Sequence, residues 1–285
     1  MLRLIFKDRA VAPEYLYVNG LVKGGTLKFD LHCHTKVGSI DAKISLEDYI
    51  RCLKKQGFGG MMITDHTSTK CWKYWDKIKD QDEFKDFVVI KGVEYDTRDA
   101  GHFIVILPEG VHLRLMNIRG LRLKHLIEVV HRCGGILGPA HPFGVKSSSY
   151  AGFRSFKKEP HLVKKFDFVE AFNTCESKEA NELSLAFAKK HNLPTTAGSD
   201  SHKEDYVGMA YTDFDYDIKT NDDMIKAIKE NRILAATGTV REATVGMAMK
   251  MHWTAVYGFM AYNVGLGYLM TPIRQFVKKR LYEAI

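Results

Sequence analysis

Histidine and carboxylate residues stand at the ends of several short apolar runs of this chain, and they come as small motifs rather than singly. The motifs are His32-Cys33-His34, Thr64-Asp65-His66, Glu94, Gly101-His102, His141-Pro142 and Asp200-Ser201-His202. Each motif is weak evidence by itself, because isolated matches of this kind are often accidental. Together, at what look like the ends of strands, they predict a metal site that holds more than one ion.

The spacing within the paired motifs has a physical basis. Side chains of a strand alternate between its two faces, so residues two apart point the same way. In the strand predicted before His34, we therefore expect His32 and His34 to share a face and Cys33 to point away. Asp200 and His202 repeat this spacing. Imidazole and carboxylate are the ligands expected for zinc, manganese or iron, whereas thiolates would favour a structural zinc site.

Residues 29–240 alternate between predicted strands and helices. The strand candidates are 28–33, 60–64, 87–92, 102–107, 135–139, 166–171 and 193–198, and the helix candidates are 45–56, 120–133, 177–191 and 221–231. Ser45 and Ser177 stand where N-caps are expected. Such alternation favours a parallel sheet, and a closed α/β barrel gathers its active groups at the carboxyl ends of its strands. His102 instead begins its strand candidate. It can reach that site if its strand runs in the opposite direction to the others, or if the turn before it folds over the open end of the barrel.

Composition bounds the function without specifying it. The length suits one large domain or two small ones. Five cysteines without a Cys-x-x-Cys pair imply no disulfide framework and favour a reducing, cytoplasmic compartment, and we find no secretory signal pattern. The formal net charge is +8, of which residues 1–28 carry +3 and residues 241–285 carry +4. The nearly neutral middle steers an anion only weakly, so bound cations would supply the local positive field.

The motifs, taken in this order, resemble those of the polymerase-and-histidinol-phosphatase (PHP) family of metal-dependent phosphoesterases. The resembling stretches are Asp-Leu-His-Cys-His-Thr, Ile-Thr-Asp-His, Gly-Val-Glu-Tyr, Gly-His-Phe-Ile, Ala-His-Pro-Phe-Gly and Gly-Ser-Asp-Ser-His. The resemblance implies a distorted (β/α)7 barrel over residues 29–240, with a metal site at the C-terminal ends of the strands. Residues 1–28 would be an N-terminal extension, and residues 241–285 an apolar C-terminal segment. The implied cofactors are two or three divalent ions, which would activate water to hydrolyse a phosphate ester.

The resemblance also implies a role for each candidate ligand. The implied sets are His32, His34, Glu94 and Asp200 for a first ion, Glu94, His102 and His141 for a second, and His66, His202 and Asp41 for a third. Where it is free of metal, His66 or His202 could instead donate a proton to the leaving group. We expect Asp65 to support an imidazole rather than bind metal. Glu170 either lines the site or is structural.

The substrate is constrained less than the chemistry. The resemblance implies either a small phosphomonoester or a phosphodiester of a nucleotide or nucleic-acid end. The Gly/Ser-rich stretch after His141 carries Lys146 and Arg154, which are candidate phosphate contacts or parts of a solvated loop. An amidohydrolase-type metal hydrolase is an alternative, but it usually needs a bridging lysine that no motif here supplies. The chain has no Gly-x-Ser-x-Gly nucleophile motif and no Gly-x-x-x-x-Gly-Lys-Ser/Thr phosphate loop.

The segment 251–273 contains no Asp, Glu, Lys or Arg and is followed by a basic cluster. Its length could span a bilayer, but His252, Asn263 and Pro272 favour a packed or interfacial helix. We therefore expect a peripheral membrane contact or a packing role for this segment. The corresponding alternative for the whole chain is a non-catalytic, membrane-associated metal-binding module. The sequence makes no prediction of the oligomeric state.

Overall fold

The computed structural model describes residues 27–144 and 148–241, which form a mixed α/β fold. The strands are β1 (Leu27–Cys33), β2 (Gly60–Ile63), β3 (Val88–Asp96), β4 (His102–Ile106), β5 (Ile136–Pro139), β6 (Val169–Asn173), β7 (Thr195–Gly198), β8 (Ala210–Phe214) and β9 (Ile233–Gly238). The helices are α1 (Leu46–Lys55), α2 (Lys70–Ile78), α3 (Leu123–Arg132), α4 (Arg154–Lys158), α5 (Lys178–His191) and α6 (Asn221–Lys229), with short 3-10 helices at Arg114–Asn117, Tyr150–Gly152, Pro160–Lys165 and Glu204–Tyr206.

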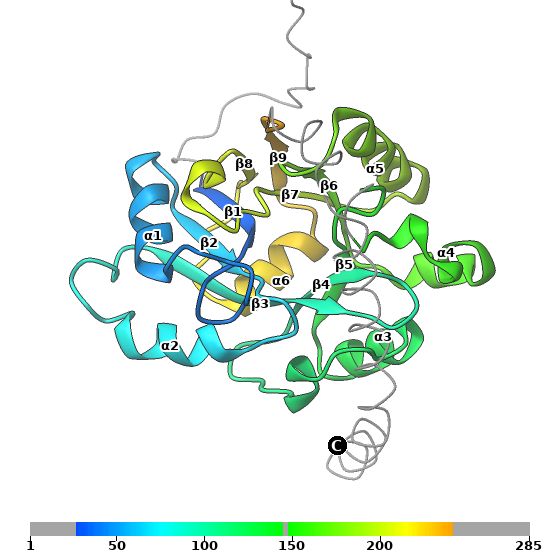
Figure 1. The fold of residues 1–285 in the computed structure, drawn as a ribbon, viewed down its shortest axis with the longest axis horizontal. Helices are drawn as coiled ribbons and strands as arrows, with labels where there is room; N and C mark the ends of the chain where they lie inside the picture. Colours follow the sequence, from blue (N-terminus) through cyan, green and yellow to red (C-terminus); the bar gives the residue numbers. More distant parts are fainter. Residues whose placement is uncertain (1–26, 145–147, 242–285) are drawn as a thin grey trace, which may run out of the picture.

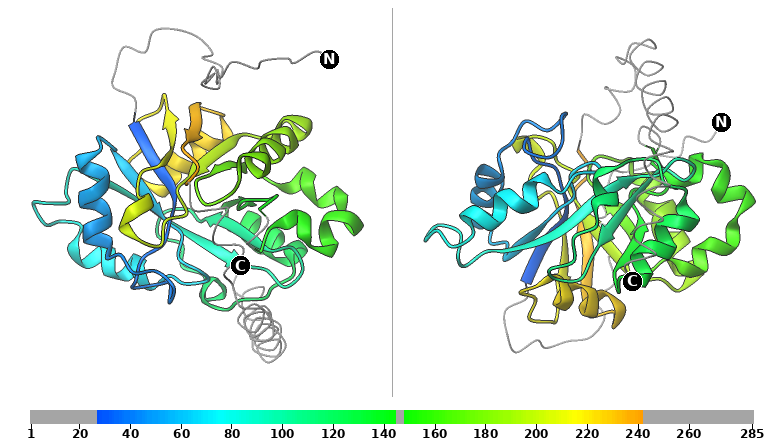
Figure 2. Two further views of the ribbon diagram at one scale, coloured as in Figure 1. Left: turned by 45° about the horizontal axis from the view of Figure 1, so that its top comes forward. Right: turned by 90° about the horizontal axis from the view of Figure 1, so that it is seen from below.

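Seven strands form one curled sheet in the order β5-β4-β3-β2-β1-β8-β9, and β6 and β7 form a separate pair (Figures 1 and 2). β1, β2 and β3 run parallel, as do β6 and β7. The other pairings are antiparallel. The predicted parallel sheet is therefore correct only in part. A short turn joins β3 to β4, and parallel neighbours would need a much longer crossover connection.

The β6–β7 pair lies between β1 and β5 and brings their ends to a common mouth. On one side the amide of Asp200 donates to the carbonyl of His32 at 2.8 Å, and on the other the amide of Asp167 donates to the carbonyl of Leu137 at 2.9 Å. The parallel strands and β5 point their carboxyl ends toward this mouth, whereas β4 begins there. This is the opposite strand direction that one of the two predicted routes for His102 required.

Both faces of the curled sheet are buried along β2, β4 and β5, whereas β9 is only partly buried. Met61 and Ile63 of β2 and Val89 of β3 belong to an outer core beneath the helices. Their neighbours Met62 and Ile90 belong to a separate inner core. α6 packs its apolar residues into the inner core and lies at the centre of Figure 1, while α1 to α5 surround the outside. Strand residues therefore alternate between two apolar layers, and the polar residues at the mouth belong to neither layer.

Two helix starts follow the predicted capping pattern. The hydroxyl of Ser45 accepts a hydrogen bond from the amide of Asp48 at 3.1 Å, and that of Ser177 accepts one from the amide of Ala180 at 3.2 Å. Each bond satisfies a backbone donor that has no partner within the helix. Both predicted caps are confirmed.

No helix within the described ranges is long and apolar enough to cross a membrane. The segment 251–273 and nearly all of the predicted N-terminal extension lie outside those ranges.

Candidate metal centre

The predicted ligands converge at the mouth formed by the strand ends. Four groups of three residues each place their ligand atoms within 4.8 Å of one another. The groups are His32, His34 and Asp200; His32, Glu94 and His141; His66, Glu94 and His102; and His34, His66 and His202. The structure therefore brings together every predicted metal ligand except Asp41 in at least one group. Asp41 lies beside the last group and is described below.

Four ligand atoms of the first predicted ion surround one point. Nε2 of His32 lies 3.1 Å from Nε2 of His34 and 3.5 Å from both Oε2 of Glu94 and Oδ1 of Asp200. Nε2 of His34 lies 3.4 Å from the same Glu94 atom and 3.1 Å from the same Asp200 atom. Ligands placed tetrahedrally at ~2.0–2.1 Å from an ion are about 3.3–3.4 Å apart. The arrangement thus has the dimensions of a divalent metal site.

Glu94 is the centre of the cluster. Its Oε1 lies 2.9 Å from Nδ1 of His102 and 2.9 Å from Nε2 of His141, while its Oε2 lies 2.9 Å from Nδ1 of His66. Burial opposes ionisation of this carboxyl, yet the charges of His102, His66 and His32 hold its pKa well below the ordinary value. An ionised carboxylate with imidazoles on both oxygens can bridge two cations.

Two buried atoms of this centre lack hydrogen-bond partners among the described residues. They are Oε2 of Glu94 and Nδ1 of His66, which face each other without hydrogen-bond geometry. Buried polar atoms are nearly always satisfied, because an unpaired one costs free energy. A cation bound by both atoms would satisfy them, so the residues present fit a metal ion.

β1 and β7 approach unusually closely where they carry the ligands. A Cβ at Gly198 would lie 2.3 Å from Cβ of His32, so only glycine allows this distance. Beyond Gly198, Asp200 turns its side chain into the mouth with a φ of 51°, and His141 has a φ of 30° after β5. Non-glycine residues rarely adopt positive φ, and such strain concentrates at functional sites.

His32 and His141 share one supporting carboxylate, Glu170 of β6. Oε1 of Glu170 lies 2.8 Å from Nδ1 of His32, and its Oε2 accepts the amide of His141 at 2.7 Å. The Nδ2 group of Asn173 donates to the same Oε2 at 3.2 Å. The structure thus places Glu170 against the site, where it fixes the ring of His32 with Nε2 toward the cluster.

His34 is supported through Ser39 and Asp65. Nδ1 of His34 lies 3.2 Å from the hydroxyl of Ser39, which donates to Oδ1 of Asp65 at 2.9 Å. Asp65 also accepts the amide of Thr35 at 2.7 Å, and it belongs to none of the ligand groups. This position agrees with the predicted support role. Burial, and then the charges of the nearby His202 and His66, lower the pKa of His34 to about 3. Its imidazole is therefore neutral and able to bind metal.

Asp96 and Arg119 are site residues that the sequence reasoning missed. Oδ1 of Asp96 lies 2.8 Å from Nε2 of His102, and Nε of Arg119 donates to Oδ2 of Asp96 at 3.0 Å. The available signal was the spacing of Glu94 and Asp96, which is the same two-residue spacing that paired His32 with His34. Arg119 had no comparable local signal, because the chain reaches the site there from a distant loop.

The third predicted ligand set lies at the exposed side of the mouth. Oδ2 of Asp41 lies 3.4 Å from Nε2 of His202 and 3.6 Å from Nε2 of His66. Burial acts to lower the pKa of His202, but the hydrogen bond with Asp41 and the charge of Asp200 raise it to about 9. His202 therefore holds a proton at neutral pH. The structure places Asp41 where the third set needs it, although Asp41 follows His34 late in the sequence.

The structure of the described residues does not connect the predicted phosphate contacts, Lys146 and Arg154, to the ligand cluster. Arg154 begins α4 and is exposed, and among the described residues it makes no hydrogen bond or ion pair with a predicted ligand. Lys146 lies outside the described residues.

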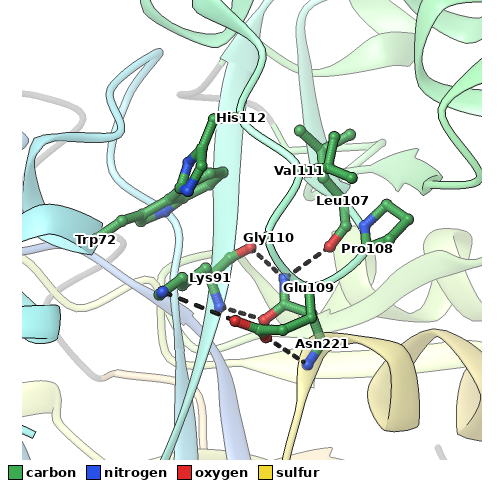
Figure 3. Close-up of a pocket in the computed structure, with 9 residues that line it drawn as sticks. All are labelled: Trp72, Lys91, Leu107, Pro108, Glu109, Gly110, Val111, His112 and Asn221. Atoms are coloured by element: carbon green, nitrogen blue, oxygen red, sulfur yellow. Dashed lines mark hydrogen bonds and ion pairs between the residues drawn. The ribbon is translucent and has the colours of Figure 1, made fainter.

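A small pocket lies at the other end of the strands (Figure 3). Lys91, which comes before Glu94 in β3, reaches Asp76 at 2.7 Å there and Glu109 at 3.9 Å. Asn221 bonds to the backbone of Lys91 and of Leu107. These contacts join α6 to the sheet, so we interpret the pocket as structural.

Known proteins share parts of this sequence and this fold. A family model described as PHP-associated matches residues 178–233. An uncharacterised protein of Methanocaldococcus jannaschii is 28% identical over 202 residues, which are 70% of this chain and 75% of that protein.

Solved structures share the fold at lower identity. A two-domain protein of Bacteroides vulgatus, which contains a predicted PHP-like metal-dependent phosphoesterase, has a TM-score of 0.57 and 20% identity, over 78% of this chain and 68% of that one. The lesion-specific endonuclease Q of Pyrococcus furiosus has a TM-score of 0.58 and 20% identity, over 75% of this chain and 59% of that one. These matches confirm the resemblance that the motifs predicted: the chain has the fold of PHP-like proteins and carries a PHP-associated segment at residues 178–233.

Proposed function

We propose that this chain is a metal-dependent phosphoesterase, which hydrolyses phosphate esters at the mouth of the curled sheet. The observation that carries the proposal is the four-atom set of His32, His34, Glu94 and Asp200, whose separations of 3.1–3.5 Å suit one divalent ion. The fold and the PHP-associated segment support the same conclusion.

We further propose that Glu94 joins two ion sites. His102 and His141 lie at its Oε1, while His32, His34 and His66 lie at its Oε2. A phosphate ester is anionic and repels hydroxide. Divalent ions held there would activate water as a nucleophile and neutralise the phosphoryl oxygens. The protein would then require no covalent nucleophile of its own.

The side chains around the ions have separate tasks in this proposal. Glu170 and Asp96 orient the rings of His32 and His102. His202, whose pKa is raised by Asp41 and Asp200 and whose side chain is 29% exposed, is the candidate donor of a proton to the leaving oxygen. His66 and Asp41 either complete a third ion site with His202 or hold it as the donor.

The amidohydrolase-type alternative is weaker. Such sites usually carry a bridging lysine, and the buried polar residues of the described ranges include no lysine. The central position between the two groups of imidazoles is taken by Glu94 instead. The substrate remains either a small phosphomonoester or a nucleotide or nucleic-acid phosphodiester. Endonuclease Q, seen in one structure with a duplex carrying an abasic lesion at its active site, makes the second class worth including in assays.

The test compares ester hydrolysis by metal-loaded and chelated protein. We expect turnover of an aryl phosphomonoester or diester with manganese, zinc or iron, and loss of turnover with chelator. A panel of nucleoside monophosphates and abasic or intact oligonucleotides then identifies the substrate class. Hydrolysis that persists fully in the metal-free protein would refute the mechanism.

A matched pair of substitutions locates the chemistry. Asp200→Asn keeps the shape of a proposed ligand but removes its charge, and we expect it to lower kcat by at least about a hundredfold, since ligand charge is needed to hold the ion. Asp167→Asn makes the same change in a carboxylate that lies 2.8 Å from Nε2 of His131, outside the cluster. Activity should survive in Asp167→Asn. Equal loss in both variants would show that the effect is on folding.

A further inference from the structure

The loop between β1 and α1 carries an isoleucine that is fully exposed beside the metal centre. Among the described residues, only Ile40 and Leu183 are exposed large hydrophobic side chains, and Ile40 has a relative exposure of 105%. Single exposed apolar residues are common on protein surfaces. The exposure of Ile40 is therefore informative only through its position, which the surrounding contacts define.

Both chain neighbours of Ile40 contact the cluster. The hydroxyl of Ser39 lies 3.2 Å from Nδ1 of His34 and accepts the amide of His66 at 3.0 Å. On the other side, Oδ2 of Asp41 lies 3.4 Å from Nε2 of His202. Successive Cα atoms are about 3.8 Å apart. Ile40 thus stands at the rim of the mouth, between two residues that touch proposed ligands.

The loop around Ile40 is held in one conformation. The amide of Ala42 donates to the carbonyl of Ser39 at 3.3 Å, which closes a tight turn with Ile40 and Asp41 at its tip. The amide of Lys43 donates to the carbonyl of His202 at 2.7 Å. Gly38 packs on Asp65, where a Cβ would come within 2.1 Å of Oδ2. An apolar side chain on such an anchored turn can contact a ligand without first ordering the loop.

The neighbouring side chains do not offer a similar contact. Lys36, Asp41 and Lys43 are the other exposed residues of this loop, and all are charged. An ester bound with its phosphoryl group in the cluster must direct its organic group out of the mouth. Ile40 is the exposed apolar side chain of this loop at that rim.

We propose that Ile40 contacts the organic group of the substrate and favours phosphate esters whose organic group presents apolar surface, such as an aryl group. This inference rests on the proposed phosphoesterase function and deepens it. An apolar contact of this kind rewards the buried surface of the ligand and leaves the phosphoryl group unaffected. Ile40 is a specificity residue in this proposal and takes no part in holding the ions.

Non-hydrolysable phosphonates test the contact without turnover. The probes are phenylphosphonate and methylphosphonate, which share the charged group and differ in the organic group. Their dissociation constants are measured by calorimetry on the metal-loaded full chain. We expect wild type to bind phenylphosphonate more tightly, and Ile40→Ala to weaken that binding by roughly three- to tenfold while leaving methylphosphonate unchanged. Ile40→Leu should retain most of the preference.

Leu183→Ala is the matched control, because Leu183 is the other exposed large apolar residue and lies on α5. It should change neither constant. The proposal is overturned if wild type binds neither phosphonate or does not distinguish them, or if Ile40→Ala weakens both equally. The proposed function fails separately. If phenylphosphonate binding depends on Ile40 but no ester is hydrolysed, the contact is supported and the hydrolase is contradicted. If esters are hydrolysed but Ile40→Ala leaves the ratio of the two phosphonate dissociation constants unchanged, the hydrolase is supported and the contact is contradicted.

Discussion

At the scale of single residues, five of the six imidazoles of the centre have their second nitrogen already held by a partner. The pairs are His32 with Glu170, His34 with Ser39, His102 with Asp96, His141 with Ser149, and His202 with the carbonyl of Asp200. Such partners set which nitrogen carries the proton and how the ring is turned. Spacing within a motif could predict the ligands. Ser39, Asp96 and Ser149 lie outside the motifs, five to eight residues from their histidines, and Glu170 lies 138 residues from His32, so motif spacing could not predict these contacts.

Glu170→Gln tests this supporting layer. The substitution keeps the size of the side chain but removes its charge, and the single amide oxygen of glutamine can accept at only one of the two positions, Nδ1 of His32 or the amide of His141. We expect metal affinity to fall roughly 10- to 100-fold, with a cooperative unfolding transition retained. Competition with a chelating indicator measures the affinity. An unchanged metal dissociation constant would mean that Glu170 serves packing alone.

At the scale of elements, the apolar runs that precede the motifs predicted β1 to β7 well, because buried strands leave a strong local pattern. The elements missed were α2, α4, β8 and β9. α2 does bury Cys71, Trp72, Trp75 and Ile78 at helical spacing, so its signal was present but short. β9 is only partly buried along its whole length and has no strong apolar alternation to read. The antiparallel pairings depend on contacts between distant segments, and local periodicity carries no information on strand direction.

The capping box of α6 gives a prediction at this scale. The hydroxyl of Thr220 accepts the amide of Asp223 at 3.2 Å, and Oδ2 of Asp223 accepts the amide of Thr220 at 3.0 Å. We expect Thr220→Ala to lower the free energy of unfolding by about 0.5–2 kcal/mol, measured by urea denaturation, while Thr220→Ser stays close to wild type. Because α6 packs against the strand ends away from the mouth, metal binding should not change in either variant. Equal stability of the two variants would contradict the assignment of the cap.

At the scale of the whole molecule, the metal centre joins parts of the chain that no single hydrogen-bond ladder connects. Its proposed ligands come from β1, β3 and β4 and from the segments after β2, β5 and β7, so they link the seven-stranded sheet to the β6–β7 pair. An ion that binds the folded arrangement and not the unfolded chain must stabilise the fold by mass action.

Metal addition should therefore raise the melting temperature of the full chain. At a free ion concentration of about 100 times the dissociation constant the gain is about 2.7 kcal/mol, which corresponds to roughly 5–10 °C for a chain of this size. Scanning calorimetry with and without chelator measures it. Asp200→Asn should lose most of this increment, because it removes a charged ligand. Thr220→Ala should melt lower in both conditions and keep the increment, since α6 and the mouth are distant and their effects add. If Asp200→Asn kept the full increment, the stabilising ion would bind elsewhere, and the cluster at the mouth would not be the metal centre.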